Sequence, residues 1–180
     1  MFTKFRAALL GYLFALALFL LLTSCGVTGE GEFTETFTFD VQRQSEIVSD
    51  TTGRQVAPDS IITVYNFSIE PGSSLVFEYG RNVHPPKNVT DAGLLETLVF
   101  QIPTGSDTFE LTGNQLSEAQ SFYRRGCFCP ESGAGFRVSD GFLEGEKLSA
   151  NIWFVRADVV ITGFRQNYEI TFEHIFRLKQ

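Results

Sequence analysis

Residues 168–178 read YEITFEHIFRL and alternate between apolar and polar side chains along nearly their whole length. An extended chain places successive side chains on opposite faces, so a period of two predicts a strand with one buried face. The predicted buried face carries Tyr168, Ile170, Phe172, Phe176 and Leu178, and the opposite face carries Glu169, Thr171, Glu173, Arg177 and Lys179. This segment indicates β-structure more clearly than any other in the chain.

The same alternation begins at Phe33, where Phe37, Phe39 and Val41 are separated by threonines and an aspartate. Between these two strands the pattern predicts further strands at 61–69, 73–79, 96–102, 107–111, 134–138, 142–147 and 148–156, and one that includes 159–161. Pro71-Gly72, Pro103-Thr104-Gly105 and Ser139-Asp140-Gly141 are typical of turns. We expect one short helix within Gln115–Tyr123 and a surface loop over Arg81–Gly93.

Many short strands with closely spaced turns favour an antiparallel β-sandwich of about 8–10 strands, with a β-barrel as the alternative. Residues 25–180 contain 15 phenylalanines and no methionine. Rigid aromatic rings have high strand propensity and suit a well-packed core. The predicted class is therefore all-β, with at most one short helix.

The first residues have the three parts of a secretory signal peptide. Lys4 and Arg6 provide a basic start, and the 16 residues from Ala7 to Leu22 carry no charge. A spanning helix needs about 20 apolar residues, so this run is too short for one. A basic start, a short apolar segment and small residues at its end predict a signal peptide over 1–24 that is cleaved.

The end of that segment, Leu22-Thr23-Ser24-Cys25, resembles the lipobox of bacterial lipoproteins. The resemblance covers about the first 25 residues and implies cleavage before Cys25, with diacylglycerol and fatty acyl groups added to that residue. It also implies a membrane as partner, reached through this lipid anchor. In such lipoproteins an aspartate after the cysteine favours the inner membrane; Gly26 stands here, so the outer membrane is favoured, with the domain facing the periplasm or the exterior.

Residues 25–32 are small or polar and predict a lipidated flexible tether, followed by a single β-domain over 33–180. The six residues from Gly26 to Gly31 reach roughly 20 Å when extended. Without Lys4 and Arg6 the chain carries 12 basic and 21 acidic side chains, a net charge of −9. A domain this acidic repels nucleic acid, so no nucleic-acid partner is expected.

Two cysteines remain after Cys25, at Cys127 and Cys129, with Phe128 between them. In an oxidising compartment two thiols pair if the geometry allows. Their Cα atoms in a straight strand lie near the limit for a disulfide, so a local turn beside Gly126 would be needed. A structural disulfide is the favoured interpretation, while free thiols and a redox or metal site stay open.

No catalytic motif is evident, and no catalytic residue, metal site or cofactor other than the lipid is predicted. His84 and His174 are too widely spaced from the cysteines to suggest a zinc site, and His174 is expected to be a core or rim residue. Two glutamate pairs share strand faces, as carboxylates in glycoside hydrolases do: Glu144 with Glu146, and Glu169 with Glu173. Solvated strand faces carry such pairs routinely.

These patterns together predict a lipid-anchored, non-enzymatic β-domain that acts as a binding or envelope-assembly module. Its aromatic faces and loops would suit a protein or glycan partner. The alternative is a carrier of apolar small molecules, for which a barrel lined by the phenylalanines would enclose a cavity. A hydrolase is the third possibility and requires a cleft in which carboxylates or a histidine converge.

Overall fold

The structure is a computed structural model in which residues 32–87, 89 and 91–179 are described. The predicted signal peptide, Cys25 and the tether up to Gly31 lie outside these residues. Within them, no helix is long and apolar enough to cross a membrane. The chain from Phe33 onward forms one compact unit.

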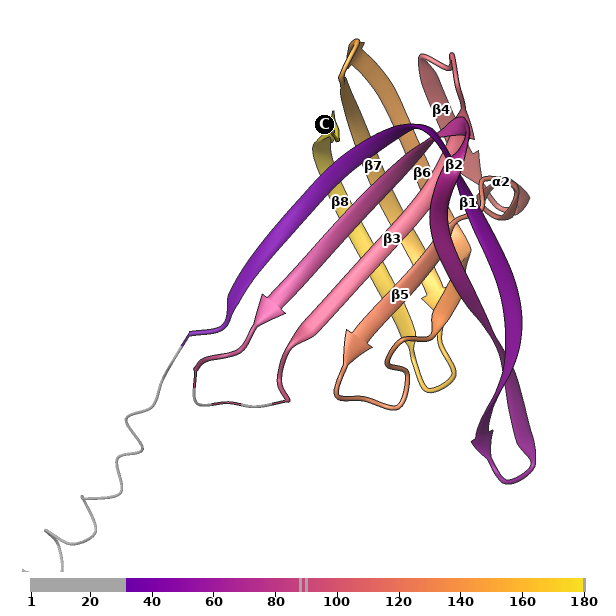
Figure 1. Cartoon of the computed structure of the whole chain (residues 1–180), viewed down its shortest axis with the longest axis vertical. Helices are drawn as coiled ribbons and strands as arrows, with labels where there is room; N and C mark the ends of the chain where they lie inside the picture. The colour runs from indigo at the N-terminus through magenta and orange to yellow at the C-terminus, as the bar shows by residue number, and fades with distance from the viewer. Residues whose placement is uncertain (1–31, 88, 90, 180) are drawn as a thin grey trace, which may run out of the picture. The chain divides into compact units, whose positions relative to one another are not determined.

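This unit consists of eight strands and one short helix, counted over the described residues (Figure 1). The strands are β1 (Thr34–Ala57), β2 (Ser60–His84), β3 (Leu94–Pro103), β4 (Thr108–Thr112), β5 (Phe122–Cys127), β6 (Gly135–Ser149), β7 (Ile152–Thr162) and β8 (Asn167–Leu178). The helix, α2 (Asn114–Glu118), lies between β4 and β5. The prediction of an all-β domain with one short helix is confirmed.

The strands follow the order β4-β6-β5-β3-β2-β1-β8-β7, and β7 pairs again with β6. All strands except β4 therefore close into a ring, as in barrel-like folds. Residues 135–137, at the start of β6, pair with β5, and residues 142–146 of the same strand pair with β4. Every pairing is antiparallel except the contact between β1 and β8, which is parallel, so the sheet is mixed rather than purely antiparallel.

The first two strands form a hairpin that is much longer than the other strands of the ring. It bends where Gln44 has a positive φ of 51° and where the β1–β2 register shifts around Ser45. Beyond the bend, the distal half of the hairpin crosses the outer face of the ring (Figure 1). A second small core fills this contact and consists of Ile47, Phe67, Val76, Val99 and Phe122.

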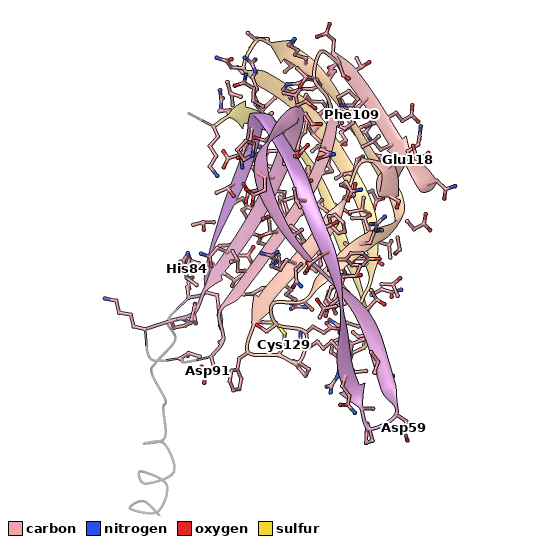
Figure 2. The ribbon with its side chains drawn as sticks, turned by 45° about the vertical axis from the view of Figure 1, so that its right-hand side comes forward. Asp59, His84, Asp91, Phe109, Glu118 and Cys129 are labelled. Carbon is pink, nitrogen blue, oxygen red and sulfur yellow. A yellow bond between two sulfur atoms is a disulfide. The ribbon has the colours of Figure 1, made fainter. Side chains whose placement is uncertain are left out.

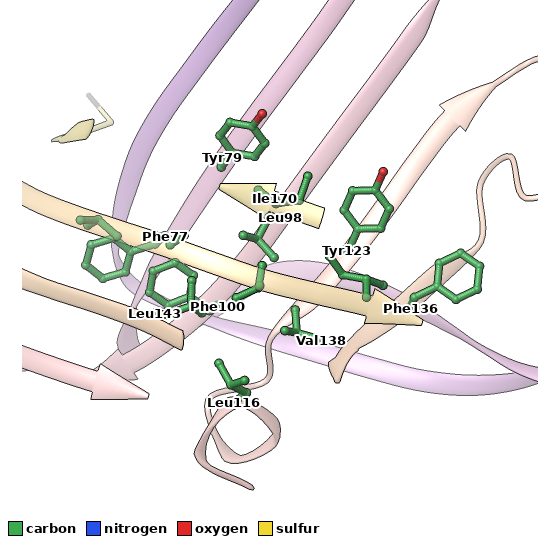
Figure 3. Close-up of a cluster of buried hydrophobic side chains, with 14 of the residues drawn as sticks. Phe77, Tyr79, Leu98, Phe100, Leu116, Tyr123, Phe136, Val138, Leu143 and Ile170 are labelled. Carbon is green, nitrogen blue, oxygen red and sulfur yellow. The ribbon is translucent and has the colours of Figure 1, made fainter. Parts of the chain in front are cut away.

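Side chains fill the interior of the ring. Figure 3 shows part of this packing, with Phe77 and Phe100 beside Leu143. The rings of Phe77 and Phe100 are stacked with centroids 4.9 Å apart, and Trp153 meets Phe77 edge-on at 5.4 Å. Aromatic pairs at these distances are well packed.

Two glycines in β6 allow close backbone contacts that a side chain would block. Gly141 has a φ of +99°, and a Cβ there would lie 2.0 Å from the carbonyl oxygen of Asp158. A Cβ on Gly135 would lie 2.1 Å from the carbonyl oxygen of Tyr65 in the hairpin. Gly141 directly follows a β-bulge at Ser139 and pairs with Val159 of β7, and Gly135 lets the hairpin pair with β6.

Several predicted boundaries were wrong. Ser139-Asp140-Gly141 is a bulge within β6 rather than a turn, and Pro71-Gly72 lies within β2 beside the bend. Residues with turn chemistry can bend a strand without ending it. The predicted loop over Arg81–Gly93 begins only after His84, because β2 continues to that residue.

Two stretches of strand were missed altogether. The outer half of β1, from Gln42 to Ala57, is rich in polar residues because most of its side chains face solvent. β5 was missed because Arg124 and Arg125 interrupt its apolar pattern. Cross-strand partners, which the local sequence does not contain, stabilise both stretches.

Candidate functional site: an aromatic seam

The ring is weakly joined where β1 meets β8. The two strands share only two register positions, Asp40↔Arg177 and Val41↔Leu178. In the part of the chain that the structure describes, residues 34–39 of β1 and 167–176 of β8 have no partner strand on the sides that face this junction. Figure 1 shows the two strands diverging from their contact near the C-terminal end of β8. Two unpaired strand edges therefore border one place.

Aromatic side chains occupy the space between these edges, and we call this set the seam. It consists of Phe37, Phe39, Tyr79, Phe172, His174 and Phe176. The rings of Phe39 and His174 are stacked with centroids 3.7 Å apart, so a β1 side chain contacts a β8 side chain directly. Phe39 also meets Phe172 and Phe176 edge-on, at 5.6 and 5.3 Å.

The exposure of the seam side chains increases from the core to the surface. Phe176 is fully buried and Tyr79 nearly so, whereas His174 is exposed and Phe37 retains 50% of its accessible surface. An exposed aromatic ring continuous with a packed aromatic cluster is typical of contact surfaces. The seam thus presents apolar surface between two sets of unpaired backbone groups.

A charged cluster beside the seam holds the free part of β1 in place. Arg81 on β2 donates two hydrogen bonds to Glu35 on β1, of 2.9 and 3.2 Å, and a third to Glu96 on β3, of 3.0 Å. Glu96 is buried and also accepts a 2.5 Å hydrogen bond from the Tyr123 hydroxyl. The hydrogen bonds from Arg81 lower the pKa of Glu35, and those to both glutamates raise the pKa of Arg81.

Two tyrosines next to this cluster have raised pKa values. Burial is the main cause for both Tyr79 and Tyr123, and the negative charge of Glu96 adds to it. Figure 3 shows the hydroxyl groups of both residues pointing to the same side of the core. Both phenols therefore stay protonated and remain hydrogen-bond donors well above neutral pH.

A concavity lies elsewhere, on the outer face of β4, β6 and β7. It measures about 600 Å³ and is lined by Thr108, Phe109, Glu110, Glu144, Gly145, Glu146, Phe154 and Arg156. Arg156 donates to Glu144 at 2.6 Å and to Glu173 at 2.8 Å, and these hydrogen bonds raise its pKa. Glu144 is thereby occupied by a cross-strand ion pair on an open face.

The carboxylate pairs noted in the sequence are not brought into a common cleft. Glu144 and Glu146 line the concavity, whereas Glu173 joins Arg156 at its edge and Glu169 is exposed on β8. Within the described ranges, no three histidine, cysteine or acidic side chains are grouped as metal ligands would be. His174 lies in the seam, and His84 ends β2 on the surface.

Cys127 and Cys129 are joined by a disulfide, with their Cα atoms 5.2 Å apart. The bond closes a small loop at the end of β5, and Phe128 between the cysteines is exposed. Arg124 and Arg125 lie on opposite faces of β5: Arg124 packs over the Phe67 ring and Arg125 over Tyr168. Burial lowers the pKa of Arg124. The two arginines therefore have separate aromatic partners.

The seam was not identified from the sequence, although its members lie in strands that were predicted. The alternation correctly placed Phe37 and Phe39 on one face of the first strand, and Phe172 and Phe176 on one face of the last strand. Their contact depends on the ring bringing the first and last strands together, which is a long-range feature. Glu96 and Arg81 were also missed. Glu96 lies within an apolar strand that gives no sign of its partner, and Arg81 was assigned to the predicted loop.

The chain was compared with known protein families, with curated proteins and with solved structures. None of the three comparisons gives a match. The function must therefore be inferred from the site.

Proposed function

We propose that this protein is a lipid-anchored, non-enzymatic module that binds an extended segment of a partner protein at the aromatic seam. The observation that carries the proposal is the pair of unpaired edges, on β1 and β8, with exposed aromatic rings between them. An extended segment can add to such an edge through its backbone and place alternate side chains against the rings. Lipid on Cys25 would hold the domain at the envelope surface.

The charged cluster supports this use of β1. A strand that receives a partner must be held firmly by its other neighbour, because a mobile edge would lose conformational entropy on binding. Arg81 ties Glu35 on β1 to Glu96 on β3, on the side of β1 away from the seam. The free edge is therefore fixed before any partner arrives.

Packing speaks against the carrier alternative. Phe77, Phe100 and Trp153 fill the ring interior at contact distance, where a carrier would hold its ligand. The hydrolase alternative has a concavity, but its Glu144 is engaged by Arg156 on an open face. A glycan could lie on exposed aromatic rings, yet it would make no use of the free backbone edges.

Co-purification from native envelopes tests the proposal. The tagged full chain would be chemically crosslinked in cells, solubilised and analysed for bound proteins. We expect Phe37→Asp to lose a protein that the wild type captures, because a carboxylate would be desolvated against the seam.

Val48→Asp provides the matched control. Val48 has a similar exposure but lies on the distal part of β1, away from the seam. Capture of the same proteins by wild type and by Phe37→Asp would contradict the proposal. A glycan ligand would be favoured if soluble oligosaccharide released the captured partner and if Phe37→Asp and Val48→Asp captured it equally well.

A further inference from the structure

One end of the domain carries exposed apolar side chains. In the part of the chain that is described, eight large apolar residues are exposed. Ile61 is at the tip of the β1–β2 hairpin, and four others lie close together at this end, around the ends of β1, β2, β3 and β5: Phe33, Val89, Leu95 and Phe128. Their accessible fractions are 54%, 40%, 51% and 82%. We call these four residues the apolar rim.

Strand pairing brings the rim together from distant parts of the chain. Thr34 pairs with His84, Val83 with Leu94, and Leu94 with Cys127. The starts of β1 and β3 and the ends of β2 and β5 therefore lie side by side. Figure 2 shows His84, Asp91 and Cys129 at this end, with Phe109 and Glu118 toward the other; Asp59, at the tip of the β1–β2 hairpin, also projects toward this end.

Phe128 is held outward by its loop. The disulfide between Cys127 and Cys129 fixes the backbone on both sides of it. Further hydrogen bonds secure the loop, from Cys127 N to Ser132 Oγ at 3.3 Å and from Gly133 N to Arg125 O at 2.8 Å. The constrained loop leaves Phe128 82% exposed, so its ring is available for contact with an apolar medium.

Charge at the rim is largely compensated. Glu35 is paired with Arg81, and Glu131 is buried with its carboxylate accepting hydrogen bonds from the backbone of Phe164 and Arg165. Among exposed charges at this end, Lys87 offsets Asp91, and Glu32 beside Phe33 adds one negative charge. A domain with a strong overall negative charge thus has an end at which apolar contact meets little repulsion.

The position of the chain's entry indicates what covers the rim. Phe33 belongs to the rim and lies eight residues after Cys25. Eight residues span at most about 29 Å. We propose that the apolar rim rests on the lipid bilayer and inserts Phe128 at the interface; this rests on the lipidation of Cys25 proposed above. The short tether gives the rim a high effective concentration at the bilayer, so weak apolar contacts suffice.

Photo-crosslinking tests this proposal with the full lipidated chain. p-Benzoylphenylalanine would replace Phe128 in one variant and Leu148 in the matched control. Leu148 is exposed to 54% but lies near the β6–β7 turn, at the opposite end of the domain (Figure 1). Each variant would be reconstituted in neutral phosphatidylcholine vesicles, irradiated and analysed by mass spectrometry. We expect several-fold more phospholipid adduct from position 128 than from position 148.

The outcomes separate the two proposals. Vesicle flotation with equal adducts at both positions, or with none at 128, would overturn the rim contact alone. Crosslinked dimers through position 128 would overturn it in favour of a second copy of this chain. Failure to float, with no added lipid mass on the Cys25 peptide, would overturn the anchor and the rim contact together.

Discussion

The β6–β7 junction and the β1–β8 seam both close the ring, but one is closed by backbone and the other by side chains. β6 and β7 are paired from Val138↔Ile161 to Ser149↔Ile152. β1 and β8 share two register positions, and stacked aromatic rings bridge the rest. A junction closed by side chains keeps its backbone groups available, which is the property that a strand-binding site requires.

The largest expected effect comes from breaking the backbone-closed junction. Gly141→Ala would place a methyl group against the Asp158 carbonyl in a backbone conformation that alanine rarely adopts. We expect the free energy of unfolding to fall by more than about 3 kcal/mol, measured by urea denaturation. Gly105→Ala is the control, since Gly105 has a similar φ of +96° but open space around it. Gly105→Ala should lower the free energy of unfolding by about 1–2 kcal/mol. An equal loss in the two variants would mean that the junction tolerates the methyl group.

Arg81→Leu should loosen the seam edge of β1. It leaves Glu96 buried without its cation, which costs about 3 kcal/mol or more. Arg156→Leu removes an arginine that also bridges two glutamates, but on an exposed face where solvent screens the charges, and should lower the stability far less. Thermal or urea unfolding would compare them. A similar loss for both variants would contradict the role given to the buried cluster.

The seam's own packing can be tested by truncation. Phe39→Ala removes the ring that contacts His174, Phe172 and Phe176, and should cost about 2–3 kcal/mol. Phe37→Ala should cost about 1 kcal/mol, because half of that side chain is already exposed. If Phe39→Ala were no more costly than Phe37→Ala in urea unfolding, side chains would not be what closes the seam.

The smallest effect concerns Tyr123 and alkaline pH. Its pKa is raised in the folded state from the ordinary value of 10.0, so the stability it contributes is fully present below pH 10 and is lost as the pH rises further. Tyr123→Phe should cost about 1 kcal/mol at neutral pH through the lost hydrogen bond. It should also make the alkaline loss of stability shallower. The measurement is the free energy of unfolding from urea denaturation between pH 8 and 11. If it fell equally steeply with pH in Tyr123→Phe and in the wild type, this role of Tyr123 would be contradicted.

The sequence predicted what depends on local pattern and missed what depends on long-range contact. The alternation at 168–178 corresponds to β8, and the alternation after Phe33 corresponds to the start of β1. Ser139-Asp140-Gly141 has the chemistry of a turn and forms a bulge, because the partner strand β7 continues past it. The contact between Phe39 and His174 joins residues 135 positions apart, and no local pattern contains it.

Residue-resolved hydrogen exchange on the full chain tests most directly whether the seam is an open edge. Amides that pair β6 with β7 should be protected throughout. In β8, every second amide between Asn167 and Phe176 should exchange rapidly, because it faces the seam rather than β7. Uniform protection along this part of β8, equal to that of β7, would show a closed junction and contradict the proposal that a partner strand binds there.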